Sequence, residues 1–223
     1  MSLIDLLFPK NCLNCGTSGK YLCTRCIKKV KLIKQVCIEC EKPAIDGMTH
    51  VKCKRKRSLD GAVSVWLYEG IVRKAITKLK YRFAYEIASE LAKITACHLK
   101  QNFTALPKDV ILTPIPLHIL RKNWRGFNQS EKIGELLAAN MGWRFVPNIL
   151  IRTKQTKPQT NLSEKARKNN LLGVFSLNPN CQLQATNYII FDDVTTTGTT
   201  LKEAAKVFKR GTVKKIWGLT VAR

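Results

Sequence analysis

Two adjacent carboxylates followed by a run of hydroxyl side chains form the stretch of this sequence with the clearest chemical potential. Asp192 and Asp193 end an apolar run, residues 188–191, that is typical of a short buried strand. The loop that follows contains Thr195, Thr196, Thr197, Gly198 and Thr199. Residues 201–210 then place apolar side chains on one face of a predicted helix. Such a loop, leading into a helix N-terminus, offers hydroxyls and unpaired N–H groups to a phosphate.

The acidic pair fits the remainder of a sugar phosphate. Ionised carboxylates only accept hydrogen bonds, and open α/β sheets bind their ligands at the carboxyl ends of strands. A ribose with its 5′-phosphate in the threonine loop would present its 2′- and 3′-hydroxyls to Asp192 and Asp193. The simpler interpretation is a strand ending in a helix cap, since Asp and Thr are common capping residues. A cap requires only one such residue, so the specific order found here favours the phosphate site.

Seven of the nine cysteines lie between positions 12 and 53; six of them form three pairs with a two-residue gap, and Cys53 follows His50 at the same spacing. Such a gap lets both members of a pair hold one tetrahedral ion, so eight ligands predict two closed structural zinc sites. The candidate ligands are Cys12, Cys15, Cys23, Cys26, Cys37, Cys40, His50 and Cys53. We expect sequential pairing, with the first four ligands in one site and the last four in the other, and a crossed arrangement is the alternative. The chain binds only one complete site if His50 is a surface residue.

The charge balance points to a polyanionic partner. Thirty-nine basic and 15 acidic residues give a net charge of +24, which a small phosphorylated substrate does not account for. One basic run follows the cysteines directly and consists of Lys54, Arg55, Lys56 and Arg57. It is a candidate for contacts with nucleic-acid phosphates or, alternatively, a solvated linker. We find no export signal and no apolar run near the roughly 20 residues of a membrane span, so we expect a cytoplasmic protein without membrane insertion.

Strand-like and helix-like segments alternate after the basic run. The predicted strands are residues 61–68, 110–116, 144–146, 188–191 and 215–222, and the predicted helices are 71–79, 85–99, one capped by Ser130, and 201–210. Alternation of this kind predicts a parallel sheet with right-handed crossovers. We therefore expect an α/β fold, a doubly wound and mainly parallel sheet over residues 58–223, behind a small zinc-ribbon domain over residues 1–57.

Two further stretches carry candidate ligand contacts. The first leaves the predicted second strand and consists of Thr113, Pro114, Ile115, Pro116 and Leu117, followed by Arg121 and Arg125. Backbone N–H groups and arginines suit a pyrophosphate there. The second is the polar stretch from Arg152 to Asn170, which includes Gln159 and Arg167. It fits a lid over a charged ligand or an ordinary surface excursion.

Together these motifs resemble the ComF family of competence-associated proteins, also called ComF/GntX. The resemblance is carried by the cysteine pairs, Pro-Ile-Pro-Leu (114–117), Arg-Gly-Phe-Asn-Gln-Ser (125–130), the run from Thr156 to Asn170, and Phe-Asp-Asp-Val-x-Thr-Thr-Gly-x-Thr (191–200). It implies a type I phosphoribosyltransferase fold behind a zinc ribbon. It also implies handling of single-stranded DNA in the cytoplasm beside a helicase-like partner. In this family pattern, His50 stands where a cysteine is usual.

The resemblance assigns roles to the candidate residues. Asp192 and Asp193 would hold the ribose of 5-phosphoribosyl-1-pyrophosphate (PRPP), residues 195–199 its 5′-phosphate, and residues 113–117 with Arg121 and Arg125 its pyrophosphate and Mg²⁺. Three functions follow: a phosphoribosyltransferase acting on a nitrogen acceptor, a non-catalytic DNA-binding adaptor, or a base-salvage enzyme. Salvage needs neither a ribbon nor a large positive charge. The intact motifs favour a PRPP site in a DNA-binding protein, with the acceptor not named by the sequence.

Overall fold

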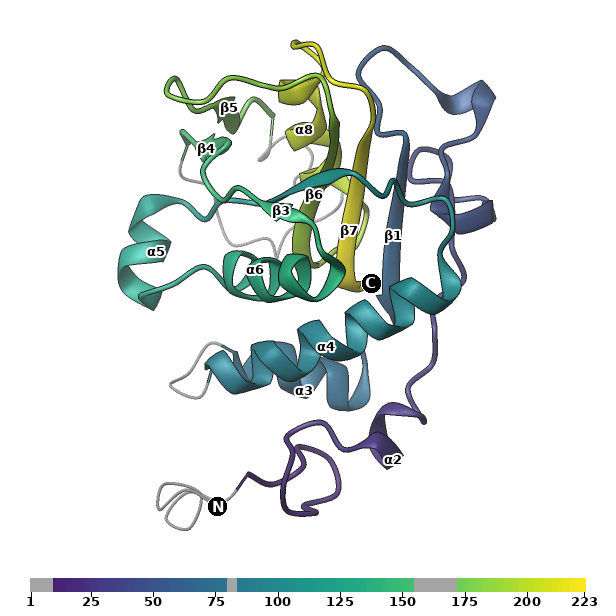
Figure 1. Ribbon diagram of the computed structural model, residues 1–223, viewed down its shortest axis with the longest axis vertical. Helices are drawn as coiled ribbons and strands as arrows, with labels where there is room; N and C mark the ends of the chain where they lie inside the picture. Colours follow the sequence, from purple (N-terminus) through teal and green to yellow (C-terminus); the bar gives the residue numbers. More distant parts are fainter. Residues whose placement is uncertain (1–9, 80–83, 155–171) are drawn as a thin grey trace.

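A five-stranded parallel sheet forms the centre of the molecule (Figure 1). The computed structural model describes residues 10–79, 84–154 and 172–223. The strands lie in the order β1-β7-β6-β2-β3, and each neighbouring pair is parallel. Their bounds are β1 Gly61–Trp66, β2 Val110–Pro114, β3 Arg144–Phe145, β6 Asn187–Val194 and β7 Ile216–Ala222. The predicted parallel α/β sheet is confirmed.

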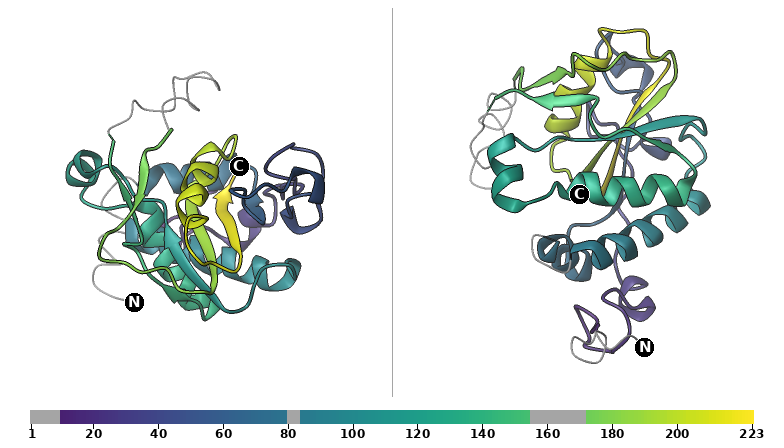
Figure 2. Two further views of the ribbon diagram at one scale, coloured as in Figure 1. Left: turned by 90° about the horizontal axis from the view of Figure 1, so that it is seen from above. Right: turned by 60° about the vertical axis from the view of Figure 1, so that its left-hand side comes forward.

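Helices cover both faces of this sheet. One face carries α3 (Gly70–Lys78), α4 (Ala84–Asn102) and α6 (Gln129–Met141), and the other carries α8 (Thr199–Phe208) (Figure 2). Side chains alternate between the two faces along β6. Ile189 and Phe191 join the apolar cluster on the α4 and α6 side, while Tyr188 and Ile190 join the cluster on the α8 side. Both faces are buried, which explains the continuous apolar run of the sequence.

Three local features differ from the sequence-based expectation. A two-stranded antiparallel pair, β4 (Leu150–Arg152) and β5 (Phe175–Leu177), flanks the region expected to be polar loop. Residues 119–125 form a short helix, α5 (Ile119–Arg125). The cap of α6 is Asn128 rather than Ser130, because the Asn128 side chain accepts a hydrogen bond from the Ser130 N–H. Strands of three residues are too short to show an alternating pattern.

The cysteine-rich segment lies along the α/β domain in two separate parts (Figure 1). It contains α2 (Thr24–Ile27) and two 3₁₀ turns, Ile45–Gly47 and Val51–Cys53. The first part, which carries the first four cysteines, lies against α4, where the N–H groups of Tyr21 and Leu22 donate to the carboxylate of Glu90. The second part, which carries Cys37, Cys40, His50 and Cys53, follows the edge of β1, where Gln35 exchanges hydrogen bonds with the backbone of Ser64. The apolar side chains of the ribbon thus join the clusters of the main domain instead of forming a core of their own.

Within the described residues, every helix is too short or too polar to cross a membrane.

Candidate functional site

The two candidate ligand loops leave neighbouring strands at the same edge of the sheet. Strands β2 and β6 are adjacent, with Pro114 opposite Phe191. The chain continues from β2 to β3 on one side and from β6 to β7 on the other, so the order of the strands reverses between β2 and β6. Such a reversal leaves a crevice at the carboxyl ends of the strands, which is where open α/β sheets bind ligands. Residues 113–117 and 192–199 therefore flank one location.

The acidic pair lies at the end of β6 and is half-buried. The Ser130 hydroxyl donates to Asp192 Oδ1 at 2.8 Å, and the Asp193 N–H reaches the same oxygen at 3.0 Å. The Val194 N–H donates to Asp193 Oδ1 at 2.8 Å. Burial, followed by the neighbouring charge of Asp193, raises the pKa of Asp192 well above its usual value, against the opposing effect of the Ser130 hydrogen bond. This arrangement favours a ligand that brings hydroxyl donors or a cation.

The threonine loop is folded around its own hydroxyls. Thr195 Oγ1 accepts from the Gly198 N–H at 3.1 Å, and the hydroxyls of Thr197 and Thr199 lie 2.8 Å apart in a hydrogen bond. Gly198, at φ +71°, takes the cap position of α8, and no side chain caps this helix. The first-turn N–H groups of α8 and the adjacent hydroxyls are thus available to an anion.

The loop after β2 offers fewer donors than its sequence suggests. Thr113, Pro114 and Ile115 are buried, and the Ile115 N–H is already bonded to the carbonyl of Phe191. Proline has no N–H group, which leaves Leu117 as the backbone donor of residues 113–117. The Thr113 hydroxyl is buried and has no hydrogen-bond partner among the described residues. A pyrophosphate at this edge would therefore meet the Leu117 end of the loop.

The predicted arginine and lid contacts are only partly described. Arg121 and Arg125 belong to α5, and the positions of their side chains lie outside the described ones. Arg152 ends β4 and places its guanidinium 5.8 Å from the ring centre of Phe175. Gln159 and Arg167 lie outside the described residues, so the lid stays a prediction.

The structure groups the first four cysteines sequentially. The sulfur atoms of Cys12, Cys15, Cys23 and Cys26 all lie within 4.8 Å of one another. A hydrogen bond from the Thr17 hydroxyl is the largest effect that lowers the pKa of Cys15, to about 5. Four convergent sulfurs with one readily ionised thiol fit a closed tetrahedral zinc site.

The second four-ligand group consists of Cys37, Cys40, His50 and Cys53, again within 4.8 Å of one another. His50 Nδ1 lies 3.4 Å from the Cys40 sulfur, and Nε2 lies 3.0 Å from the carbonyl of Pro43. A proton on Nε2 donates to that carbonyl and leaves the Nδ1 lone pair directed at the three sulfurs. Three thiolates and one imidazole also suit tetrahedral zinc, and the prediction of sequential pairing agrees with this geometry.

The basic run divides into two kinds of residue. Lys54 contacts Asp60 at 2.8 Å, and Asp60 also binds Lys209 at 3.0 Å, so Lys54 has a partner within the chain. All four residues of the run, Lys54 included, are exposed. A cleft of about 510 Å³ is lined by both arginines together with Thr197, Thr199 and Lys202. The basic run therefore opens onto the same cleft as the threonine loop, a proximity that the sequence does not indicate.

Four residues of this region carry no sequence signal that assigns them to the site. Ser130 is expected to cap a helix but binds Asp192. Ile38, Glu41 and Arg223 contact the threonine loop or its neighbours from distant parts of the chain. Ser130 and Ile38 lie within sequence motifs, but no spacing links Ile38, Glu41 or Arg223 to the threonine loop, because contacts between distant segments leave no local pattern.

These features define a class of protein, a parallel α/β domain with an acidic pair and a threonine-rich loop at one edge of the sheet, and two zinc-ligand clusters. Residues 3–55 match the family described as a double zinc ribbon domain. Over 196 residues the chain is 31% identical to DNA utilization protein YhgH of Salmonella typhi, covering 85% of this chain and 84% of that protein. It is 30% identical over 231 residues to competence protein F of Haemophilus influenzae, covering 96% and 98%.

Bacillus subtilis competence protein ComFC is 27% identical over 216 residues, covering 91% of this chain and 84% of that protein. The chain belongs to this family of competence F and YhgH proteins. Among solved structures, a hypoxanthine phosphoribosyltransferase from Staphylococcus aureus matches with a TM-score of 0.38 and 12% identity over 60% of this chain and 61% of that one. An adenine phosphoribosyltransferase from Saccharomyces cerevisiae matches with a TM-score of 0.33 and 18% identity over 60% and 69%.

Proposed function

We propose that this protein binds PRPP with Mg²⁺ at the carboxyl ends of β2 and β6 and transfers its phosphoribosyl group, as part of handling single-stranded DNA in competence. The observation that carries the proposal is the convergence of Asp192, Asp193 and the threonine loop at the position where the strand order reverses. The names of its relatives, DNA utilization protein and competence protein, support the cellular context.

Each part of the ligand has a matching group. The 5′-phosphate lies against residues 195–199 and the uncapped N-terminus of α8. The ribose hydroxyls donate to Asp192 and Asp193, which relieves the repulsion between the two carboxylates. The pyrophosphate extends toward Leu117, with Arg121 and Arg125 on the following helix.

The reaction is displacement of pyrophosphate from the anomeric carbon by a nitrogen nucleophile. The C1–O bond to pyrophosphate breaks as the new C–N bond forms, positive charge develops on the ribose, and the proton of the nitrogen passes to the leaving pyrophosphate. Asp192 and Asp193 stabilise that charge in a partly buried setting. Mg²⁺ would neutralise the leaving pyrophosphate. Arg152, Gln159 and Arg167 belong to the segment proposed to exclude water from the site.

Calorimetric titration tests the binding step. The protein should bind Mg²⁺–PRPP at one site per chain, and ribose 5-phosphate should compete for it. Absence of saturable binding by the zinc-loaded protein would remove the PRPP assignment. Release of pyrophosphate on addition of an acceptor would establish transfer.

A DNA-binding adaptor without catalysis is the second candidate. It is supported by the exposed side chains of Arg55, Lys56 and Arg57 and by the net charge of +24. In this case PRPP would bind without being consumed. The two candidates differ in one measurement, because an adaptor releases no pyrophosphate with single-stranded DNA, nucleotides or free bases, whereas a transferase does with its acceptor. A salvage enzyme would use free bases alone.

A further inference from the structure

We propose that the second zinc cluster is a positioning element of the phosphate loop, acting through Ile38, Glu41 and Arg223. The inference rests on the proposed function of that loop and adds zinc-dependent regulation to it. When the second cluster holds its ion, the loop is kept in the conformation that receives a 5′-phosphate. When the ion is absent, affinity for 5′-phosphorylated ribose falls.

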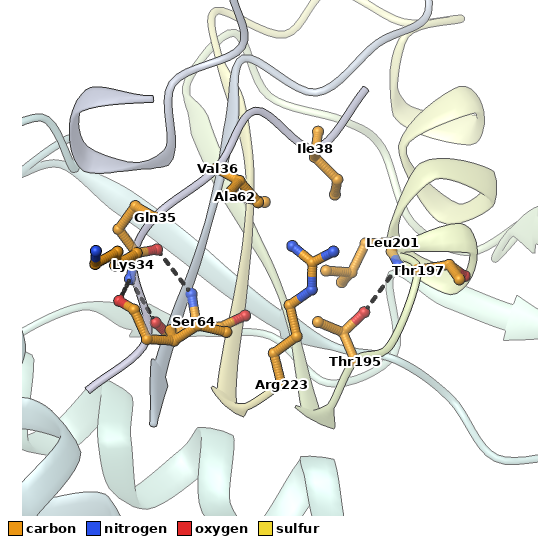
Figure 3. Close-up of a pocket in the computed structure, with 12 residues that line it drawn as sticks. Lys34, Gln35, Val36, Ile38, Ala62, Ser64, Thr195, Thr197, Leu201 and Arg223 are labelled. Atoms are coloured by element: carbon orange, nitrogen blue, oxygen red, sulfur yellow. Dashed lines mark hydrogen bonds between the residues drawn. The ribbon is translucent and has the colours of Figure 1, made fainter. Parts of the chain in front are cut away.

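The first contact is between Ile38 and Gly198. Ile38 lies between the ligands Cys37 and Cys40, is 7% exposed and belongs to the apolar cluster that contains Leu201. A Cβ atom added to Gly198 would lie 2.8 Å from Ile38 Cδ1. Glycine is therefore required at this position both by its φ of +71° and by close packing against the zinc cluster. Ile38 and the loop residues Thr195 and Thr197 line the same pocket (Figure 3).

The second contact runs through the last residue of the chain. Arg223 Nε donates to the carbonyl of Thr196 at 3.0 Å, and Arg223 Nη2 lies 2.9 Å from Glu41 Oε1. Figure 3 shows the Arg223 side chain directed into the pocket between Ile38 and the segment that carries Thr195 and Leu201. The backbone of the loop is also held by a hydrogen bond from the Thr195 N–H to the carbonyl of Ala222. Arg223 thus joins the loop to the residue that follows the ligand Cys40.

Glu41, the residue after the ligand Cys40, has a strained backbone conformation. Its φ is +59°, in the left-handed region that non-glycine residues rarely adopt. The turn is closed by hydrogen bonds from the Glu41 N–H to the Cys37 carbonyl at 2.8 Å and from the Cys37 N–H to the Lys42 carbonyl at 2.9 Å. Such strain persists only where the surroundings impose it. Removal of the ion frees the turn to relax, and the carboxylate then moves away from Arg223.

A third contact completes the connection. Lys202, in the first turn of α8, lies 3.6 Å from Glu39, the residue between Ile38 and Cys40. Glu39 and Lys202 are both partly exposed, so this pair alone contributes little. It does place a further residue of the Cys37–Cys40 turn against α8. The first cluster differs, because its segment packs against α4 through Glu86 and Glu90.

The matched pair Ile38→Ala and Ile45→Ala tests the packing contact. Both isoleucines belong to the second part of the ribbon, but Ile45 is 77% exposed. If the loop of Ile38→Ala is in its binding conformation about a tenth of the time, affinity for ribose 5-phosphate falls about tenfold. Ile45→Ala should bind as the parent does, and pyrophosphate affinity should be unchanged in both. Both variants should retain two zinc ions.

Hydrogen exchange of residues 195–201 provides a readout that needs no ligand. Exchange should be faster in Ile38→Ala, in Arg223→Gln and in Cys53→Ser than in the parent, and unchanged in Cys15→Ser, which affects only the first cluster. Equal exchange in Ile38→Ala and the parent overturns the inference. If the parent itself fails to bind ribose 5-phosphate, the proposed function and the affinity claim are wrong, while the exchange comparison still decides the positioning claim.

Discussion

Ser130 in the first turn of α6 donates a hydrogen bond to Asp192 at the end of β6, with 2.8 Å between Oγ and Oδ1. The contact joins a helix N-terminus to the acidic pair and opposes the effects of burial and of Asp193 on the Asp192 carboxyl. Without a ligand, the site is therefore unfavourable for two ionised carboxylates. The resulting loss of stability can be measured without any substrate.

The first prediction concerns stability and pH. A carboxyl whose pKa is higher in the folded protein is more protonated there than in the unfolded chain, so stability falls as pH rises above the unfolded pKa of about 4. Burial and Asp193 raise the pKa of Asp192 in this way. Asp192→Asn should therefore melt at a higher temperature than the parent at pH 7 and at a similar temperature near pH 3. Thermal melts without ligand give the comparison.

Exposed Asp109 supplies the control, because Asp109→Asn makes the same change in net charge without removing a half-buried carboxyl. It should leave the pH dependence unchanged. A lower melting temperature for Asp192→Asn than for Asp109→Asn at pH 7 would mean that Asp192 is not under electrostatic strain in the ligand-free site.

The second prediction concerns ligand binding by the other carboxylate. Asp193→Asn keeps the shape of the side chain and the oxygen that accepts from the Val194 N–H. It removes the carboxylate charge that we propose contacts the ribose hydroxyls. Removing one charge-assisted hydrogen bond should weaken Mg²⁺–PRPP binding by roughly 1.5–3 kcal/mol, or about ten- to a hundredfold. Any turnover should fall further, because the charge matters more in the transition state. Unchanged affinity by calorimetry would contradict the ribose assignment.

The third prediction separates the two ends of the ligand. Thr197→Val removes a hydroxyl of the loop at nearly constant volume and should weaken ribose 5-phosphate binding by about tenfold. It should not change the affinity for pyrophosphate, which we propose binds near Leu117. Thr212→Val is the matched control, since Thr212 is exposed and follows α8 rather than preceding it. Equal reductions for both ligands would mean that the valine disturbs the whole site.

The sheet and its loops could be predicted from the sequence because their signals are local. The apolar run before Asp192, the helical face of α8 and the pairs of cysteines each depend on residues close in the chain. The contact of Ile38 with Gly198 joins positions 160 residues apart, and the pairing of Arg223 with Glu41 joins positions 182 apart. No spacing rule reports such pairs. The packing of the ribbon against the threonine loop is therefore seen only in the folded chain.

The fourth prediction concerns zinc. Two complete ligand sets predict two ions per chain by elemental analysis. Cys15→Ser should reduce the count to one while leaving ribose 5-phosphate affinity near that of the parent, because the first cluster packs against α4. Cys53→Ser should also reduce the count to one but weaken that affinity. A parent protein with a single ion would mean that His50 and its three cysteines do not form a zinc site.

The last prediction concerns DNA. Replacing Arg55, Lys56 and Arg57 by Gln should weaken binding of single-stranded oligonucleotides and reduce the slope of log affinity against log salt by about 0.7 for each phosphate that the variant no longer neutralises. Lys54→Gln removes one charge from the same run, but Lys54 is paired with Asp60, so its effect on the slope should be smaller than that of Arg55→Gln. Fluorescence anisotropy over a series of salt concentrations measures both. Equal slopes for the triple variant and the parent would make the run a linker and place the DNA-binding residues elsewhere on the surface.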